Sequence, residues 1–344
     1  MWNILRNVLF KLYPDAELGH ERMLALSSGL QRLVPERLLS MVTPRSDPCL
    51  ARTVCGLTFP NPLGLAAGFD KNAVALLLWQ ALGFGFIEAG TVTLRPQSGN
   101  VRPRLFRIPE SRAIINSLGF PGLGAEAVVR NIQQAGKLKI PLGINIGRNA
   151  KTNNEDAAAE YVCLLEYVYP FADYIAVNIS SPNTKGLRLL LGYDFASEIF
   201  HEISLSRQRL LDAGKPYKPV FVKISPDVMH AELGDVLKVV EDCGVDGIIV
   251  ANTTINRTGL KPAQWQHAKG GLSGAPLYHR TLEMIHRVHY DAPSLPIIAS
   301  GGIETSQQVS EVLKAGASLV QIYTALIYGG PTLPRKILSE LVAL

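Results

Sequence analysis

The chain contains only four cysteines among its 344 residues, Cys49, Cys55, Cys163 and Cys243. No two of them have the C-x-x-C spacing of a metal or redox site, so we expect them to be reduced and mostly buried, as in a reducing compartment. The seven histidines form no ligand cluster, and we expect no metal. No apolar run reaches about 18 residues, which argues against a transmembrane helix.

Charge is also sparse. Charged residues make up 18% of the chain, apolar residues 47%, and the net charge is +5 without a basic run. This composition supports a large core and excludes global disorder, and we expect no nucleic-acid partner. Acidic residues at Asp15, Glu17 and Glu21 are atypical of a mitochondrial transit peptide, and a secretory signal with a cleavage site is not apparent either.

From residue 63 onward, short apolar runs alternate with stretches of helical spacing. Continuously apolar runs of this length are typical of parallel strands covered on both faces. Eight strand-then-helix units predict an α/β fold, a (β/α)8 TIM barrel, with an open doubly wound sheet as the structural alternative. The expected strands are 63–68, 84–90, 142–147, 174–180, 220–225, 247–253, 296–302 and 319–324. The expected helices are 73–82, 125–135, 156–167, 195–212, 231–243, 280–290, 306–315 and 334–342.

Two connections are too long for simple turns. Residues 91–124 and 254–276 are rich in Arg, Pro, Asn and Gly and carry no helical stripe. Both follow the carboxyl end of a predicted strand, which is where barrel enzymes place their active sites. We therefore expect these two segments to form a lid or binding element. Residues 55–61 predict a hairpin that closes the barrel floor.

The N-terminal 42 residues form a separate predicted unit ahead of a catalytic domain at 50–344. Trp2, Leu5, Val8, Leu9 and Leu12 share one helical face, and a second amphipathic helix is expected at 17–33, before a Pro-rich linker at 43–48. Two interpretations remain open from the pattern alone. The pair is either a helical hairpin packed on the barrel or an amphipathic pair lying in a membrane interface.

The residues at the predicted strand ends suit a cofactor that carries a phosphate. Gly-rich turns at 300–302 and 270–274, together with Tyr323-Thr324, match the usual phosphate cradle of barrels. The loop 178–188 is crowded with Asn, Ser and Thr, which suit an amide-like heterocycle, although it could be only a polar turn. Lys71 is either a solvated rim charge or a cation for a ligand, and Lys223 either snorkels or points into the mouth. A G-x-G-x-x-G dinucleotide motif is absent, which favours a mononucleotide.

Eight separated motifs resemble those of dihydroorotate dehydrogenases, in the order of that family. They cover nearly the whole chain and lie at 64–71, 90–93, 116–120, 143–147, 178–184, 252–254, 271–274 and 300–302. The resemblance implies oxidation of dihydroorotate to orotate in pyrimidine biosynthesis, with one FMN per subunit as hydride acceptor. It also implies that Ser181 is the general base that removes a proton from C5 of the substrate.

The resemblance implies further roles by position. The implied substrate-binding residues are Lys71, Asn116, Ser117, Leu118, Gly119, Phe120, Asn178, Asn183, Asn252 and Thr253. The implied FMN-binding residues are Ala67, Gly68, Asp70, Lys71, Thr91, Asn145, Asn178, Lys223, Ala251, Gly274, Gly302, Tyr323 and Thr324, with Lys223 near the electron-accepting edge of the ring and the last four residues at the phosphate. A proton path from Ser181 through Thr184 and a water is implied as well.

Ser rather than Cys at position 181, and the N-terminal helical pair, are similar to the class 2, membrane-associated branch. That branch implies a quinone, ubiquinone or menaquinone, as final acceptor, reached through a tunnel lined by His20, Arg107 and Tyr323. It favours the membrane-interface interpretation and a peripheral protein on the cytoplasmic face of a bacterial inner membrane, with a processed mitochondrial form as the alternative. We expect a monomer. Competing hypotheses are a soluble acceptor such as fumarate or NAD, and a non-catalytic flavin-binding or membrane-scaffold protein.

Overall fold

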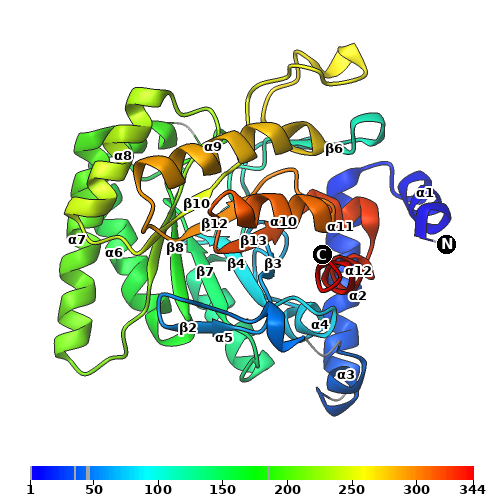
Figure 1. The fold of residues 1–344 in the computed structure, drawn as a ribbon, viewed down its shortest axis with the longest axis horizontal. Coiled ribbons are helices and arrows are strands. Elements are labelled where there is room, and N and C mark those ends of the chain that lie inside the picture. Colours follow the sequence, from blue (N-terminus) through cyan, green and yellow to red (C-terminus); the bar gives the residue numbers. More distant parts are fainter. Residues whose placement is uncertain (1, 35, 44–46, 185) are drawn as a thin grey trace.

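A computed structural model describes residues 2–34, 36–43, 47–184 and 186–344, and it shows a closed barrel of eight parallel strands (Figure 1). All eight predicted strands are confirmed. Seven are shorter than expected because the polar end of each already belongs to the following loop, whereas the second has the expected length but lies two residues further along the chain. In barrel order from the first, they are β3 (Leu63–Leu65), β4 (Phe86–Val92), β7 (Leu142–Ile146), β8 (Tyr174–Asn178), β9 (Val220–Lys223), β10 (Gly247–Val250), β12 (Ile297–Ser300) and β13 (Leu319–Ile322). The alternative of an open sheet is therefore wrong.

Helices surround the barrel, and the eight predicted ones are confirmed within a few residues. They are α4 (Leu76–Ala81), α5 (Gly124–Ala135), α6 (Ala157–Val168), α7 (Tyr193–Asp212), α8 (His230–Asp242), α9 (Tyr278–Asp291), α10 (Ser306–Lys314) and α12 (Leu333–Leu341). One short helix, α11 (Thr324–Gly329), was not expected. It follows the last barrel strand directly and is too short for a helical stripe to be visible in the sequence.

Aromatic rings fill the lower end of the barrel. Phe86, Tyr174 and Phe221 are buried there, with successive ring centroids 6.4 and 5.4 Å apart. Glycines on neighbouring strands leave room for these rings, since a Cβ at Gly64 would lie 2.3 Å from the Phe86 ring and one at Gly143 would lie 2.1 Å from the Tyr174 ring. The barrel is thus a packed core, and any ligand must enter at the other end.

The predicted floor hairpin is confirmed. It consists of β1 (Arg52–Val54) and β2 (Leu57–Phe59), which pair antiparallel. Val54 and Phe59 are buried against the aromatic layer of the barrel.

The two long connections, expected as irregular lid segments, together build a small sheet. β5 (Leu105–Ile108) and β6 (Ala113–Asn116) come from the first connection, and β11 (Gly271–Gly274) comes from the second. They pair antiparallel in the order β11-β6-β5. β5 and β6 pair locally, whereas β11 pairs with β6 across more than 150 residues of sequence. Each strand has only four residues, which is too short for a clear strand signal in the sequence.

The N-terminal extension lies against one side of the barrel, beside α4, α11 and α12 (Figure 1). It contains the two expected helices, α1 (Trp2–Leu12) and α2 (Ala16–Leu33), and a third, α3 (Glu36–Val42), that the sequence did not predict. Part of the expected linker, residues 44–46, lies outside the described residues. Within the described chain, no helix combines the length and apolar character needed to cross a membrane.

The expectation that the cysteines are mostly buried is wrong. All four are free thiols, but Cys49 and Cys163 are exposed, and Cys55 and Cys243 are partly exposed. Cys163 lies on α6, on a face that points away from the barrel. The local sequence around it is apolar on both sides, which is why exposure could not be seen there.

Candidate active site

A cleft opens at the carboxyl ends of the barrel strands, beneath the small sheet, and holds about 1030 Å³ of empty space, its open mouth included. Most of the residues predicted for substrate or cofactor line it. These are Ala67, Gly68, Lys71, Thr91, Asn116, Leu118, Gly119, Phe120, Asn178, Ser181, Asn183, Lys223, Ala251, Asn252, Thr253, Gly274, Gly302, Tyr323 and Thr324. The structure thus gathers segments from the whole length of the chain into one site.

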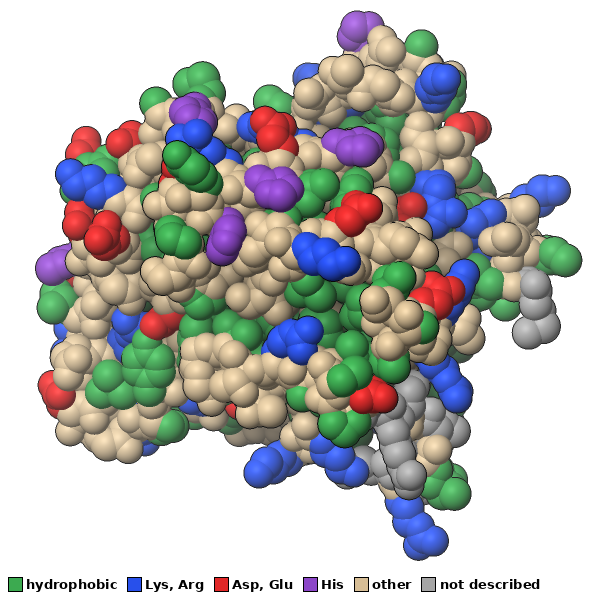
Figure 2. All heavy atoms as spheres, viewed as in Figure 1, with side chains coloured by type: hydrophobic (Ala, Val, Ile, Leu, Met, Phe, Trp, Pro, Cys, Tyr) green, Lys and Arg blue, Asp and Glu red, His purple; other side chains and the backbone are tan. Residues whose placement is uncertain are grey.

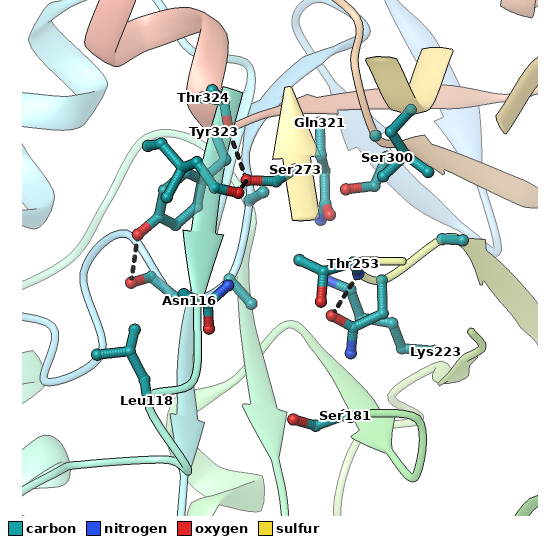
Figure 3. A pocket seen from close by; sticks show the side chains of 18 of the residues that line it. Asn116, Leu118, Ser181, Lys223, Thr253, Ser273, Ser300, Gln321, Tyr323 and Thr324 are labelled. Carbon is teal, nitrogen blue, oxygen red and sulfur yellow. Dashed lines mark hydrogen bonds between the residues drawn. The ribbon is translucent and has the colours of Figure 1, made fainter. Parts of the chain in front are cut away.

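The cleft has two chemically different ends (Figure 3). Ser181, Lys223 and Thr253 lie toward one end, and Ser300, Gln321 and Thr324 lie toward the other. The first end carries amides, hydroxyls and a cation. The second is formed by glycine-rich turns and hydroxyl groups, so one elongated ligand with a polar ring and an anionic tail would match both ends.

Asparagine side chains hold the first end together. Asn183 donates from Nδ2 to Asn116 Oδ1 at 3.0 Å, which joins the loop after β8 to β6. Asn252 donates to Asn178 Oδ1 at 3.3 Å, and Asn178 donates in turn to Thr91 Oγ1 at 3.1 Å. Because amides both donate and accept, these side chains present a mixed pattern suited to a ring with alternating C=O and N–H groups.

Ser181 lies in the loop that follows β8. Its side chain is only 5% exposed, and its Oγ accepts a 3.3 Å hydrogen bond from the backbone N–H of Asn183. Thr184 is also buried, and its hydroxyl has no hydrogen-bond partner among the described residues. Buried hydroxyl groups without a partner are uncommon in folded proteins, and this one lies three residues after Ser181 in the sequence.

Lys223 ends β9 inside the cleft and is buried, so the interpretation of a snorkelling edge lysine is wrong. Its Nζ lies 3.6 Å from Glu88 Oε1, and Glu88 is completely buried on β4. Glu88 also accepts hydrogen bonds from Tyr174 Oη at 3.1 Å, Gln321 Nε2 at 2.6 Å and Asn145 Nδ2 at 2.9 Å. The buried Lys223 ammonium therefore lies next to a Glu88 carboxylate whose oxygens both accept hydrogen bonds. A buried ion pair needs such additional hydrogen bonds to offset the cost of desolvation.

Lys71 is half-buried at the rim and lines the cleft, so it is not a freely solvated charge. Burial lowers the pKa of Lys71 to about 8, while the carboxylate of Glu17 acts in the opposite direction. A lysine in this position is a cation that can be neutralised near physiological pH, as at many functional sites.

Three of the residues predicted to bind substrate or cofactor do not line the cleft. Asp70 turns its carboxylate to the start of α4, where it accepts from the backbone N–H groups of Val74 and Ala75 at 2.9 Å each. Asn145 lies behind the wall and accepts a 2.6 Å hydrogen bond from Thr91 Oγ1. Ser117 contributes backbone bonds that shape the neighbouring loop.

The other end of the cleft follows β12 and β13, the seventh and eighth strands of the barrel. Gly274 and Gly302 have φ of 101° and 74°, and a Cβ on Gly302 would lie 2.4 Å from the backbone N of Tyr278. Ser273 and Thr324 share a 2.9 Å hydrogen bond, and the unexpected helix α11 starts at Thr324. Loops after strands seven and eight with a short extra helix are the usual phosphate site of this fold.

The three residues predicted for a quinone tunnel lie on the side of the N-terminal extension. His20 of α2 stacks edge-on against Phe69 at 5.1 Å, and Phe69 stacks against Tyr323 at 5.2 Å. Tyr323 lines the cleft, whereas His20 does not. Burial, followed by the nearby charge of Lys71, lowers the pKa of His20 to about 3.

Arg107 of β5, the third of these residues, fastens the turn between α1 and α2. It donates to the carbonyl oxygens of Tyr13 and Pro14, and its guanidinium lies 4.2 Å from the centre of the Phe10 ring. Burial lowers the pKa of this guanidinium.

Sequence reasoning missed several residues in the cleft or beneath it. Gln321 lines the cleft, and Glu88 is buried beside Lys223. Both sit inside apolar strands and look like isolated polar residues in the sequence. Leu277, just after the second long connection, also lines the cleft, and so does Ser273, which lies in the expected glycine-rich turn but was given no role of its own. A polar residue inside an otherwise apolar barrel strand was the available signal for Glu88 and Gln321, because such a residue must find a buried partner.

Comparison with known proteins agrees with this geometry. The family model for dihydroorotate dehydrogenase matches residues 49–344. Proteins named dihydroorotate dehydrogenase (quinone) match over nearly the whole chain. The one from Chloroflexus aurantiacus is 45% identical, covering 97% of this chain and 93% of that protein. The one from Thermus thermophilus is 44% identical, covering 99% of this chain and 96% of that protein.

Solved structures match as well. The crystal structure of the dihydroorotate dehydrogenase of Eimeria tenella in complex with ferulenol has a TM-score of 0.88 at 37% identity, covering 98% of this chain and 94% of that one. The ligand-free structure of the same enzyme has a TM-score of 0.86. The chain therefore belongs to the dihydroorotate dehydrogenase family, and the relatives that it matches from end to end are of the quinone type.

Proposed function

We propose that this protein oxidises dihydroorotate to orotate, with FMN as the immediate hydride acceptor and a membrane quinone as the final electron acceptor. The observation that carries the proposal is the meeting of Ser181, Lys223 and the asparagine set in one cleft that has a glycine-rich turn at its far end. The type of reaction is supported by membership of the dihydroorotate dehydrogenase family and by the names of the relatives.

The cleft fits FMN on its own features. Gln321 Oε1 is buried without a partner among the described residues, so it is free to accept from a ring N–H. A Cβ at Gly274 would meet the backbone O of Arg112 at 2.2 Å, so the turn keeps its width only with glycine there. We assign the phosphate to Gly274, Gly302, Tyr323 and Thr324, and the ring to the region of Thr91 and Lys223. When bound, FMN supplies a two-electron acceptor for the hydride that leaves C6 of the substrate.

Ser181 is the proposed base for the proton at C5. Serine is a weak base, so it must pass the proton on. Thr184 with a water is the proposed route, because the Thr184 hydroxyl has no hydrogen-bond partner within the part of the chain that the structure describes. General-base assistance of this kind contributes roughly 10²–10⁴ in rate. Loss of the C5 proton and the C6 hydride together leaves the C5=C6 double bond of orotate.

The remaining groups bind and orient. In this proposal Asn116, Asn183 and Asn252 hydrogen-bond the pyrimidine ring, and Lys71 pairs with the substrate carboxylate. All four residues line the cleft. Lys223 favours negative charge that develops beside it, which is electrostatic stabilisation by a preorganised group. Its own charge is held by Glu88 below.

Membrane association through α1–α3 is part of the proposal. Large apolar side chains are exposed along these helices, among them Ile4, Val8, Leu26, Leu33 and Met41. Figure 2 shows hydrophobic side chains beside Lys and Arg at the ends of this extension. Exposed apolar faces flanked by cations are typical of helices that lie in a lipid interface.

An anaerobic spectral titration tests the proposal. Dihydroorotate is added to the purified yellow protein, and a ubiquinone analogue is added afterwards. Bleaching by dihydroorotate followed by recovery on quinone is the expected result. Bleaching without recovery would point to a soluble acceptor, and a flavin that dihydroorotate cannot bleach would overturn the proposed reaction.

A further inference from the structure

Residues 97–104, here called the strap, form the last part of the connection from β4 to β5. Asn100 on the strap donates from Nδ2 to the backbone oxygens of Ser117 and Asn183, at 2.9 Å each. Its backbone N–H also donates to Leu118 O at 3.0 Å. One side of the strap therefore sets the backbone positions of both loops that bring Asn116 and Asn183 to the substrate.

The opposite side of the strap faces α2. Arg104 donates from Nη2 to Glu17 Oε1 at 2.7 Å and from Nε to Glu17 Oε2 at 3.0 Å. Its other nitrogen, Nη1, donates to the backbone oxygens of Ser98 at 2.6 Å and Asn100 at 2.5 Å. A planar guanidinium can bind a carboxylate along one edge and carbonyl groups along another, so Arg104 ties α2 and the strap to each other rigidly.

Burial makes this connection strong. Arg104 is 4% exposed and Glu17 is 7% exposed. Removing one partner of such a pair leaves an unpaired buried charge, which is far more costly than losing a surface pair. One turn along α2, Glu21 pairs with Arg102, which also lies 3.2 Å from Glu17 Oε1, but the side chains of Arg102 and Glu21 are both 47% exposed. An exposed pair of this kind contributes little, so Glu21 provides a matched control on the same helix.

We propose that the Glu17–Arg104 pair and Asn100 are positioning residues that couple the seating of helix α2 to the affinity of the orotate pocket. None of the three lines the cleft. The inference rests on the proposed function, because it assigns the substrate pocket to orotate. Coupling between two sites is reciprocal, so orotate in the pocket also stabilises α2 against the barrel. The position of the N-terminal extension, which is proposed to bind the membrane, is thereby coupled to orotate binding.

The test uses flavin-loaded full-length protein and titrates orotate against the flavin absorbance. E17Q is expected to raise the orotate Kd about 5- to 20-fold, within the usual range of coupling between sites. E21Q is expected to leave it within twofold. N100A breaks the other end of the connection and is expected to raise Kd as well. Both changes interrupt the same connection, so their effects should not add. The orotate Kd of the double variant E17Q/N100A should exceed that of the weaker-binding single variant by less than twofold.

Hydrogen exchange of α2 gives an independent measurement that a purely structural role would not change. Orotate is expected to slow exchange in α2 of the wild type and of E21Q, and to lose this effect in N100A, whose substitution on the exposed strap leaves the core intact. An unchanged orotate Kd in E17Q, or α2 exchange that orotate does not alter in the wild type, would overturn the coupling. A wild type that fails to bind orotate at all would instead remove the proposed function beneath it.

Discussion

We predict that the protein loses stability in mild acid because of His20. Its Nε2 is 2.8 Å from the backbone oxygen of Phe69, so the neutral ring donates to that carbonyl from a partly buried position between α2 and the barrel. Burial and the charge of Lys71 lower the pKa of His20 from 6.5 to about 3. Protonation in the folded state is thus disfavoured, and the unfolded chain takes up the proton first.

The sign and size follow from linkage. Between pH 6.5 and about 3 the unfolded chain binds one more proton at this site, so stability is lost as the pH falls through that window. Between pH 7 and pH 5 the loss amounts to at most about 2 kcal/mol, from roughly 1.4 kcal/mol per pH unit below the unfolded pKa. That is a large fraction of the 5–15 kcal/mol typical of folded proteins.

Urea unfolding of the wild type and H20Q at both pH values measures this contribution. Glutamine can still donate an amide hydrogen to Phe69 O but does not titrate. Between pH 7 and pH 5, the free energy of unfolding of H20Q is therefore expected to fall by about 2 kcal/mol less than that of the wild type. H201Q, which removes an exposed histidine from α7, controls for the loss of a histidine as such. Equal losses in H20Q and the wild type would refute the reasoning.

Three further predictions concern the cleft and the core. S181A should slow flavin reduction by dihydroorotate roughly 10²–10⁴-fold in anaerobic stopped flow while the protein stays yellow; an unchanged rate would exclude this serine as the base. Because the pKa of Lys71 is about 8, orotate affinity should fall up to about tenfold from pH 7 to pH 9, and a flat profile would contradict a role for its charge. G64A places a Cβ 2.3 Å from the Phe86 ring, which should cost about 1–3 kcal/mol in thermal unfolding, whereas G29A on α2 meets nothing within 4 Å and should not destabilise.

The pairing of Glu88 with Lys223 shows how the site depends on the barrel interior. Glu88 touches no solvent and receives hydrogen bonds from three other strands of the barrel, through Tyr174, Gln321 and Asn145. Hydrogen bonds from three side chains satisfy this buried carboxyl group, and Lys223 beside it lines the cleft. The polar floor of the site is thus built into the strands, whereas the loops supply the groups around the substrate.

The sequence by itself determined the barrel and most of its site. Each barrel strand lies in a short, mostly apolar run because both of its faces are covered, and that signal is local. The polar residues expected at the mouth, such as Ser181, Asn252 and Thr324, immediately follow those runs. Since parallel strands all end at the same edge, their order along the chain already predicted that these residues would meet.

Tertiary structure decided the features that depend on distant partners. The small sheet joins segments more than 150 residues apart, and Arg104 meets Glu17 across 87 residues, so no local pattern announces either contact. Asp70 lies in a motif that resembles a cofactor site, yet its carboxylate accepts hydrogen bonds from the backbone N–H groups of Val74 and Ala75, just before α4, and from Trp79 Nε1. Exposure of Cys163, burial of Lys223 and the lowered pKa of His20 likewise follow from what packs around each side chain, and only the folded chain fixes those neighbours.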